Sequence, residues 1–221
     1  MNPQAERILE CLHEVAAERV RRQGDPGLAE RVHEIKRFQH LRFQRTYADL
    51  LASPRYSRAA QFFLDDLYGP EDFTRRDEQF ARVVPGLVRL FPLEIVGTVM
   101  SLGELHALSE QFDTAMGAVI DGPAIDDSQY AEAWRRVGRP ADRERQIMLM
   151  MAVGSALDRY TRNPLLRTSL RLMRGPASAA GLGVLQAFLE RGFDTFRDMR
   201  GAQEFLATVT RRERELAARL F

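Results

Sequence analysis

A short charged segment carries the side chains best suited to bind a polar ligand. The neighbouring carboxylates Asp65 and Asp66 and the hydroxyl of Tyr68 precede a second charged pair, Arg76 and Asp77. Carboxylates that face arginine inside a cleft are typical of a polar binding site. We therefore expect these five side chains to line a ligand-binding pocket, and we assign no catalytic residue.

The two aspartates also have a structural interpretation. We expect Asp65 and Asp66 in the last turn of a helix, where the backbone already presents partial negative charge, so each carboxylate there costs up to about 1 kcal/mol. Arginines from elsewhere would compensate this cost and clamp two helices together; the candidates are Arg75, Arg76, Arg143 and Arg162. The pattern thus fits a charge-paired clamp, a binding site, or simple exposure of both carboxylates.

Metal chemistry is indicated by two Glu-x-x-His pairs, Glu10 with His13 and Glu30 with His33. This spacing places a carboxylate and an imidazole on one helix face, as di-iron carboxylate bundles require. However, Glu10 and His13 lie away from the apolar side of their helix, so we expect them to face water. Such a site also needs bridging glutamates, for which the candidates are Glu104 and Glu110. We predict no metal site and no cofactor.

A further series, His33, His40 and Tyr47, recurs at seven-residue intervals along one edge of a predicted helix. A haem or metal ligand would suit this spacing, but an imidazole at the edge of a core more often serves as a hydrogen-bonded structural group. We find no Gly-x-Ser-x-Gly, Cys-x-x-Cys, His-Glu-x-x-His or phosphate-binding glycine motif.

The charge composition does not indicate a nucleic-acid or membrane partner. The chain has 32 basic and 31 acidic residues, both signs are interleaved, and Lys36 is the only lysine. The arginines of residues 19–45 alternate with glutamates, which weakens the field that a phosphate backbone requires. The arginine excess is explained either by codon bias or by forked contacts to carboxylate or phosphate.

The expected location is cytoplasmic. Cys11 is the single cysteine and falls on the apolar side of the first predicted helix, which fits a small core residue in a reducing compartment. The N-terminal residues show no signal peptide pattern. The longest apolar run, residues 147–153, is much too short to span a bilayer.

Proline and glycine punctuation predicts an all-α chain of about ten helices. Caps are expected at Thr74 with Asp77 and at Asp126 with Gln129, and Ser53 with Pro54 is expected to open a helix. The glycines of residues 179–184 are expected inside a helix, where they allow close packing. The predicted helices are 3–23, 26–52, 54–67, 74–90, 92–120, 127–137, 140–161, 164–173, 177–199 and 201–220.

The helix at 140–161 is predicted to lie at the centre of the bundle. Its segment 147–153, which includes three methionines, is apolar on all sides and would be unfavourable in water unless neighbours surround it. Apolar stripes at helical spacing in residues 105–119 and 182–199 supply faces for packing. With no repeat or linker, residues 1–221 are expected to form one helical domain.

Residues Phe62 to Tyr68, which read FFLDDLY, resemble the motif of the bacterial FFLEELY-motif proteins, with aspartates in place of the glutamates. The resemblance extends through Arg76 with Asp77, Gln146 with Ile147, and Leu157 with Asp158, to the C-terminal Arg- and Glu-rich helix, so it covers most of the chain. It implies an all-helical fold. It implies no activity and no catalytic residue, because this family is uncharacterised.

Two classes of function follow. The first is a non-enzymatic protein that acts through protein–protein contacts or self-association, for which the amphipathic C-terminal helix, with Leu216, Leu220 and Phe221 at its end, is the candidate surface. The alternative is a small-molecule-binding or metal-dependent helical enzyme with a polar pocket around the FFLDDLY segment. The absence of a converging reactive set favours the first.

Overall fold

The computed structural model describes residues 2–67, 73–120, 122 and 124–221. Every regular element in these ranges is helical, which confirms the predicted all-α fold. None of the helices in these ranges is long and apolar enough to cross a membrane.

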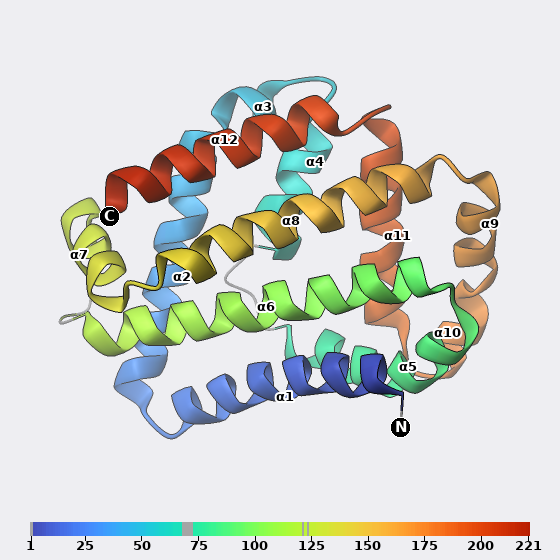
Figure 1. Ribbon diagram of the computed structural model, residues 1–221, viewed down its shortest axis with the longest axis horizontal. Coiled ribbons are helices and arrows are strands. Elements are labelled where there is room, and N and C mark those ends of the chain that lie inside the picture. The colour runs from blue at the N-terminus through green and yellow to red at the C-terminus, as the bar shows by residue number, and fades with distance from the viewer. Residues whose placement is uncertain (1, 68–72, 121, 123) are drawn as a thin grey trace.

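The elements are α-helices and one π-helical turn, η1 (Figure 1). Their bounds are α1 Pro3–Gln23, α2 Pro26–Thr46, α3 Ala48–Ala52, α4 Ser57–Phe62, η1 Phe63–Leu67, α5 Thr74–Leu90, α6 Leu93–Val119, α7 Asp127–Val137, α8 Pro140–Thr161, α9 Pro164–Leu172, α10 Arg174–Ala179, α11 Gly183–Asp198 and α12 Gln203–Leu220.

Side-chain caps start several helices. The side chains that accept a hydrogen bond from a first-turn N–H belong to Asn2, Asp25 and Asn163. The predicted capping box of α7 forms between Asp126 and Gln129. The predicted cap of Thr74 with Asp77 is wrong, because α5 begins without a side-chain cap and Asp77 bonds instead to residues of α1 and α6.

Three predicted helices are shorter or interrupted. The helix expected at 26–52 divides into α2 and α3 at Tyr47, whose backbone leaves the helical region while its ring is fully buried. The helix expected to open at Ser53 and Pro54 begins only at Ser57 and ends as η1. Gly181 interrupts the third with a φ of 70°, a conformation that glycine adopts readily. The glycines of residues 179–184 therefore lie around a turn, not inside a helix as predicted.

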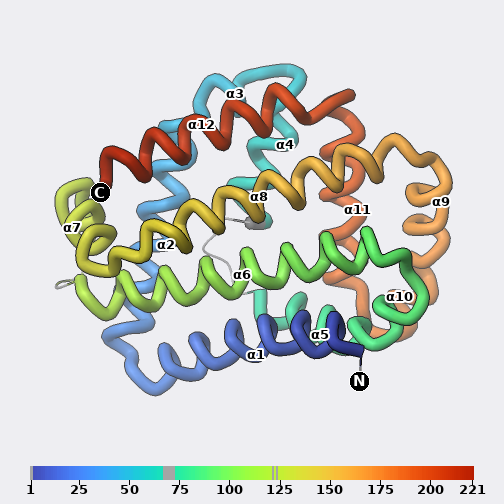
Figure 2. The backbone as a smooth tube through the Cα atoms, viewed as in Figure 1, coloured from blue at the N-terminus to red at the C-terminus, as the bar shows by residue number. Residues whose placement is uncertain are grey.

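The helices form two crossed layers. In Figure 1, α1, α6, α8 and α12 lie side by side across the molecule, and α2, α4 and α11 cross behind them at a steep angle. The same path is visible in the tube of Figure 2. Helix α6 packs against α1, α2, α7 and α8. It buries residues on several sides, including the polar Glu110, Asp113 and Thr114.

The predicted central position of the 140–161 helix agrees with the packing of α8, which lies between α6 and α12 and also packs against α11. Ile147, Met150 and Val153 are buried there. Met148 is 59% exposed and Ala152 is exposed as well, so the expectation that neighbours enclose this segment on every side is wrong at these two residues. The layer has an outer face, and Met148 lies on it.

The largest core cluster lies where α4, η1, α11 and α12 meet α8. Phe62 and Phe63 are both buried in it, and the Phe63 ring lies edge-on to that of Phe205, with ring centroids 5.3 Å apart. The paired phenylalanines that open the FFLDDLY segment therefore anchor η1 in the core.

Close approach of α6 to α2 predicts a sharp difference between two glycines of α6. A Cβ at Gly117 would lie 2.6 Å from Cγ2 of Val32 and 3.4 Å from its backbone nitrogen, whereas one at Gly97 would meet nothing within 4 Å. Gly117→Ala should lower the free energy of unfolding by about 1–3 kcal/mol through overpacking, because the β-branched valine cannot move aside. Gly97→Ala should raise it by up to about 1 kcal/mol through helix propensity. Urea unfolding of both variants measures this, and equal effects would contradict the packing described.

Candidate functional site

The described residues surround a partly enclosed cavity of about 220 Å³ between the two layers. Its wall combines side chains from α2, α5, α6, α8 and α11 with smaller contributions from other elements. A core cavity of about 150 Å³ is known to hold a benzene molecule, so this space is large enough for a small organic ligand.

One half of the wall is apolar. Helices α5 and α6 are joined by only Phe91 and Pro92, so the end of α5 lies close to the start of α6. Moving away from this junction, only apolar residues line the cavity over the next turns of both helices; they are Leu87, Val83 and Phe80 on α5 and Val99 and Leu102 on α6. Polar residues are reached only beyond these turns.

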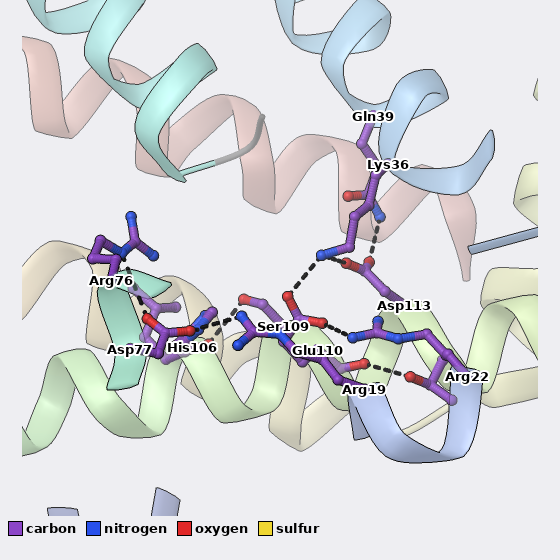
Figure 3. A network of polar contacts seen from close by, with 12 residues as sticks. Arg19, Arg22, Lys36, Gln39, Arg76, Asp77, His106, Ser109, Glu110 and Asp113 are labelled. Carbon is purple, nitrogen blue, oxygen red and sulfur yellow. Dashed lines mark hydrogen bonds and ion pairs between the residues drawn. The ribbon is translucent and has the colours of Figure 1, made fainter. Parts of the chain in front are cut away.

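The other half of the wall is polar. His106, Ser109, Glu110 and Asp113 occur at spacings of three and four residues, which place them on one face of α6. At 1.5 Å per residue this polar row extends for roughly 10 Å along the helix. Figure 3 shows that partners from α1, α2 and α5 meet the row as two groups, one around Asp77 and one around Glu110.

Asp77 is the centre of the first group. Its Oδ2 accepts hydrogen bonds from Nη2 of Arg19 at 2.7 Å and from Nε2 of His106 at 2.8 Å, and its Oδ1 lies 3.5 Å from Nε of Arg76. Burial alone would raise the pKa of Asp77, but the hydrogen bond and charge of His106, together with Arg76 and Arg19, lower it to about 2. Asp77 is therefore ionised at neutral pH and can only accept, so Nε2 of His106 carries a proton.

Arg76 contacts two aromatic rings. Its guanidinium carbon is 4.1 Å from the ring centroid of Phe73 and 4.6 Å from that of Phe188, and Nη1 donates to the backbone oxygen of Asp66 at 3.0 Å. Burial lowers the pKa of Arg76, although Asp77 opposes this effect. Cation–π contacts with both rings, together with the hydrogen bond to Asp66, help to hold the guanidinium in place beside the cavity.

Glu110 is the centre of the second group. It accepts hydrogen bonds from Arg22 and, at 2.7 Å, from Nζ of Lys36. Burial would raise the pKa of Glu110, but the charges of Lys36 and Arg22 lower it to about 2. Asp113 lies 3.5 Å from the same Nζ and accepts from Gln39 at 3.0 Å, yet burial outweighs these contacts and raises its pKa. Lys36 thus bridges two buried acids.

The structure brings together only part of the predicted site. Arg76 and Asp77 line the cavity, whereas Asp65 and Asp66 do not. Asp65 is exposed and accepts from Gln61 at 2.7 Å. Asp66 forms an ion pair with Arg191 of α11, an arginine outside the predicted candidates. Asp66 therefore acts as the clamp between helices that the alternative interpretation described. Tyr68 lies outside the described residues.

Several members of the polar wall were not assigned to the site from the sequence, among them Lys36, His106, Ser109, Glu110 and Asp113. A signal existed, because residues 106, 109, 110 and 113 are polar at helical spacing within a largely apolar helix. The apolar stripe of the same helix hid this second face. Glu110 entered the sequence analysis only as a candidate bridging glutamate.

The metal interpretation gains no support from the described part of the chain. There, no group of three or more His, Cys, Asp or Glu side chains could hold a metal ion. Glu10 and His13 are exposed, as predicted. Tyr47 donates to Glu213 at 2.7 Å, and Nε2 of His40 lies 3.3 Å from Nε2 of Gln44.

The low pKa values of Asp77 and Glu110 predict acid sensitivity. A carboxylate whose folded pKa is depressed contributes stability above its unfolded pKa and loses it as the pH falls through the folded pKa. Each group should contribute about 2–3 kcal/mol that disappears between about pH 4.5 and pH 2. The raised pKa of Asp113 acts in the opposite sense, since its contribution is lost as the pH rises above its unfolded pKa. Urea unfolding at several pH values across this range measures the net effect of the three groups on the free energy of unfolding.

Glu110→Gln isolates one of these contributions. At neutral pH the variant leaves Arg22 and Lys36 without their shared carboxylate, so the free energy of unfolding should fall by about 3–5 kcal/mol. The loss should shrink towards zero near pH 2, where the wild-type carboxyl is itself protonated. The matched control is Glu10→Gln, whose side chain is 62% exposed and should change the value by less than about 0.5 kcal/mol. A pH-independent loss would contradict this assignment.

Comparison with known proteins identifies a family without an assigned activity. A family model described as "Domain of unknown function (DUF8198)" matches residues 18–221. Neither the curated proteins nor the solved structures gave a match. The matched range contains Arg19, Arg22 and all of α2 to α12, and so nearly the whole cavity wall. Because it spans most of the sequence, the chain belongs to the family described as a domain of unknown function, DUF8198.

Proposed function

We propose that this protein binds a small amphipathic organic molecule in the cavity between its two layers. The observation that carries the proposal is the division of one continuous wall into an apolar half on Leu87, Val83 and Val99 and a polar half on His106 and Glu110. Ligand sites are typically apolar clefts that hold a few fixed polar groups, and this wall has that composition.

The polar half supports binding because its groups are held in place before a ligand arrives. Each carboxylate of the two groups is paired with a cation or an amide from a different helix. Side chains fixed in this way lose little conformational entropy on binding, which favours affinity. We propose binding and no catalysis, because the one hydroxyl of the polar row has other partners. Ser109 Oγ donates to the backbone oxygen of Leu105 and accepts from Nε2 of Gln146.

Protein–protein contact is the second candidate. Of the C-terminal residues first considered for it, Leu220 packs against a core cluster, and the Phe221 ring lies 5.9 Å from that of Trp134 although Phe221 is 47% exposed. Other apolar side chains are open to solvent and favour a partner surface; between 73% and 75% of each is exposed, and they are Leu90, Leu93, Leu165 and Leu172. If the protein self-associates through these leucines, the double variant Leu165→Ser, Leu172→Ser should have the molar mass of a monomer in light scattering.

Two further parts of the proposal concern context. A cytoplasmic location is supported by Cys11, which is a free and buried thiol. We also propose that residues 62–68 are a variant of the FFLEELY motif. The burial of Phe62 and Phe63 and the ion pair of Asp66 with Arg191 give such a motif a structural role.

The binding proposal is tested with 1-octanol as a neutral amphipathic probe. Titration of ¹⁵N-labelled protein should give saturable shift changes confined to residues of α5, α6 and α11 that line the cavity. Leu102→Trp fills the apolar half and should weaken binding by about ten-fold or more, because the cavity volume is lost.

The matched control is Leu172→Trp, which adds the same ring to the exposed face of α9. It should leave the affinity within about two-fold of the wild type, a difference below ~0.5 kcal/mol. Shift changes scattered over the exposed leucines, or equal effects of the two tryptophans, would rule out the cavity as the binding site.

A further inference from the structure

We infer that the ligand's head group is an anion, a carboxylate or a phosphate, held by Arg76 and His106, with its apolar part along Phe80, Val83 and Leu102. This inference rests on the proposed function and names the ligand class for the same cavity.

The position of the head group follows from the order of residues along the two helices. Arg76 and His106 contact the same carboxylate, that of Asp77, so they are neighbours at one place on the wall. Phe80 lies one turn from Arg76 on α5, and Leu102 lies one turn from His106 on α6. A ligand whose head group contacts Arg76 and His106 therefore has apolar wall directly beside it.

The carboxylates of the two groups already have donors within the protein. Asp77 accepts from Arg19 and His106, Glu110 accepts from Arg22 and Lys36, and Asp113 accepts from Gln39. A cationic head group would have to compete with these donors, which belong to the protein and are already in position. The wall is thus poorly suited to recognise a cation.

Arg76, in contrast, retains unused donors. A guanidinium has five N–H groups, and among the described residues Arg76 makes one hydrogen bond, from Nη1 to Asp66, and one longer ionic contact, from Nε to Asp77. The guanidinium is planar, so its remaining N–H groups point outward in that plane, while its carbon contacts the rings of Phe73 and Phe188. Edge-on, paired N–H groups are the geometry that binds carboxylate and phosphate.

His106 adds a second contact of suitable chemistry. Its Nε2 donates to Asp77, and its other ring nitrogen has no hydrogen-bond partner in the part of the chain that the structure describes. When protonated, that Nδ1 donates to an anion. The charge balance agrees, because the guanidinium groups of Arg19 and Arg76 face the single carboxylate of Asp77. An anionic head group would restore neutrality at this buried position.

Four probes that share an octyl chain and differ in head group test the inference: octanoate, octyl phosphate, 1-octanol and octylammonium, each below its micelle-forming concentration. Titrated into the full chain near neutral pH, at least one anion should bind about ten-fold or more tightly than octanol, the factor expected for a charge-assisted hydrogen-bonded pair. Octylammonium should bind more weakly than octanol. The anion that binds more tightly identifies the head group as carboxylate or phosphate.

Arg76→Gln should remove the advantage of the anions and leave octanol binding unchanged, while Arg76→Lys should retain part of it. The control is Arg75→Gln, a neighbouring arginine that is exposed and does not line the cavity. If circular dichroism shows that Arg76→Gln does not fold, His106→Gln takes its place and should reduce the anion preference. If the preference for anions over octanol persists in a folded Arg76→Gln or His106→Gln variant, the assignment of the anion site is overturned.

The outcomes separate the two proposals. Equal affinities for all four head groups, or a preference for octylammonium, would overturn the anion inference while the binding cavity stands. Failure of all four probes to bind the wild-type protein would overturn both.

Discussion

The ion pairs that connect α1 to the buried carboxylates Asp77 and Glu110 are the interaction on which the interior of this structure depends. A carboxylate removed from water without a partner carries a penalty of several kcal/mol or takes up a proton. Arg19 and Arg22, three residues apart on one face of α1, each reach one of these acids. A single helix therefore neutralises both charges, and its position against α5 and α6 is fixed by the two contacts. The carboxylates stay ionised at neutral pH, so the groups around them keep their roles as donors.

Helix α2 both packs closely on α6 and contributes to the cavity wall. At Gly117 the missing side chain lets Val32 approach α6 directly. Farther along α2, which crosses α6 at a steep angle in Figure 1, Lys36 and Gln39 line the cavity, and the side chain of Lys36 reaches Glu110. Polar side chains held in such hydrogen bonds keep their extended conformations. Helix α2 thus packs directly on α6 at Val32 and is connected to it, one turn later, through the charged side chain of Lys36.

The helices were largely predictable from the sequence, and the site was predictable only in part. Helices α1, α7 and α8 follow the predicted ranges because asparagine, aspartate and proline mark their starts locally, and α5 follows its range although the expected cap does not form. The break at Tyr47 escaped prediction because it is stabilised by tertiary contacts, the burial of the ring and its bond to Glu213. Arg76 and Asp77 were identified from a local charge cluster, whereas pairings such as Arg22 with Glu110 join residues far apart in the chain. Local patterns show that α6 has polar positions but not which helix will face them.

Lys36 gives this chain an unusual analytical property. It is the only lysine, and its amine lies at the cavity wall between two acids, with the side chain only 17% exposed. Reagents selective for primary amines therefore have one side-chain target in the whole protein. The rate at which the Lys36 amine is acylated reports how freely solvent enters the space between the layers, and peptide mass mapping separates it from the N-terminal α-amine without any engineered label.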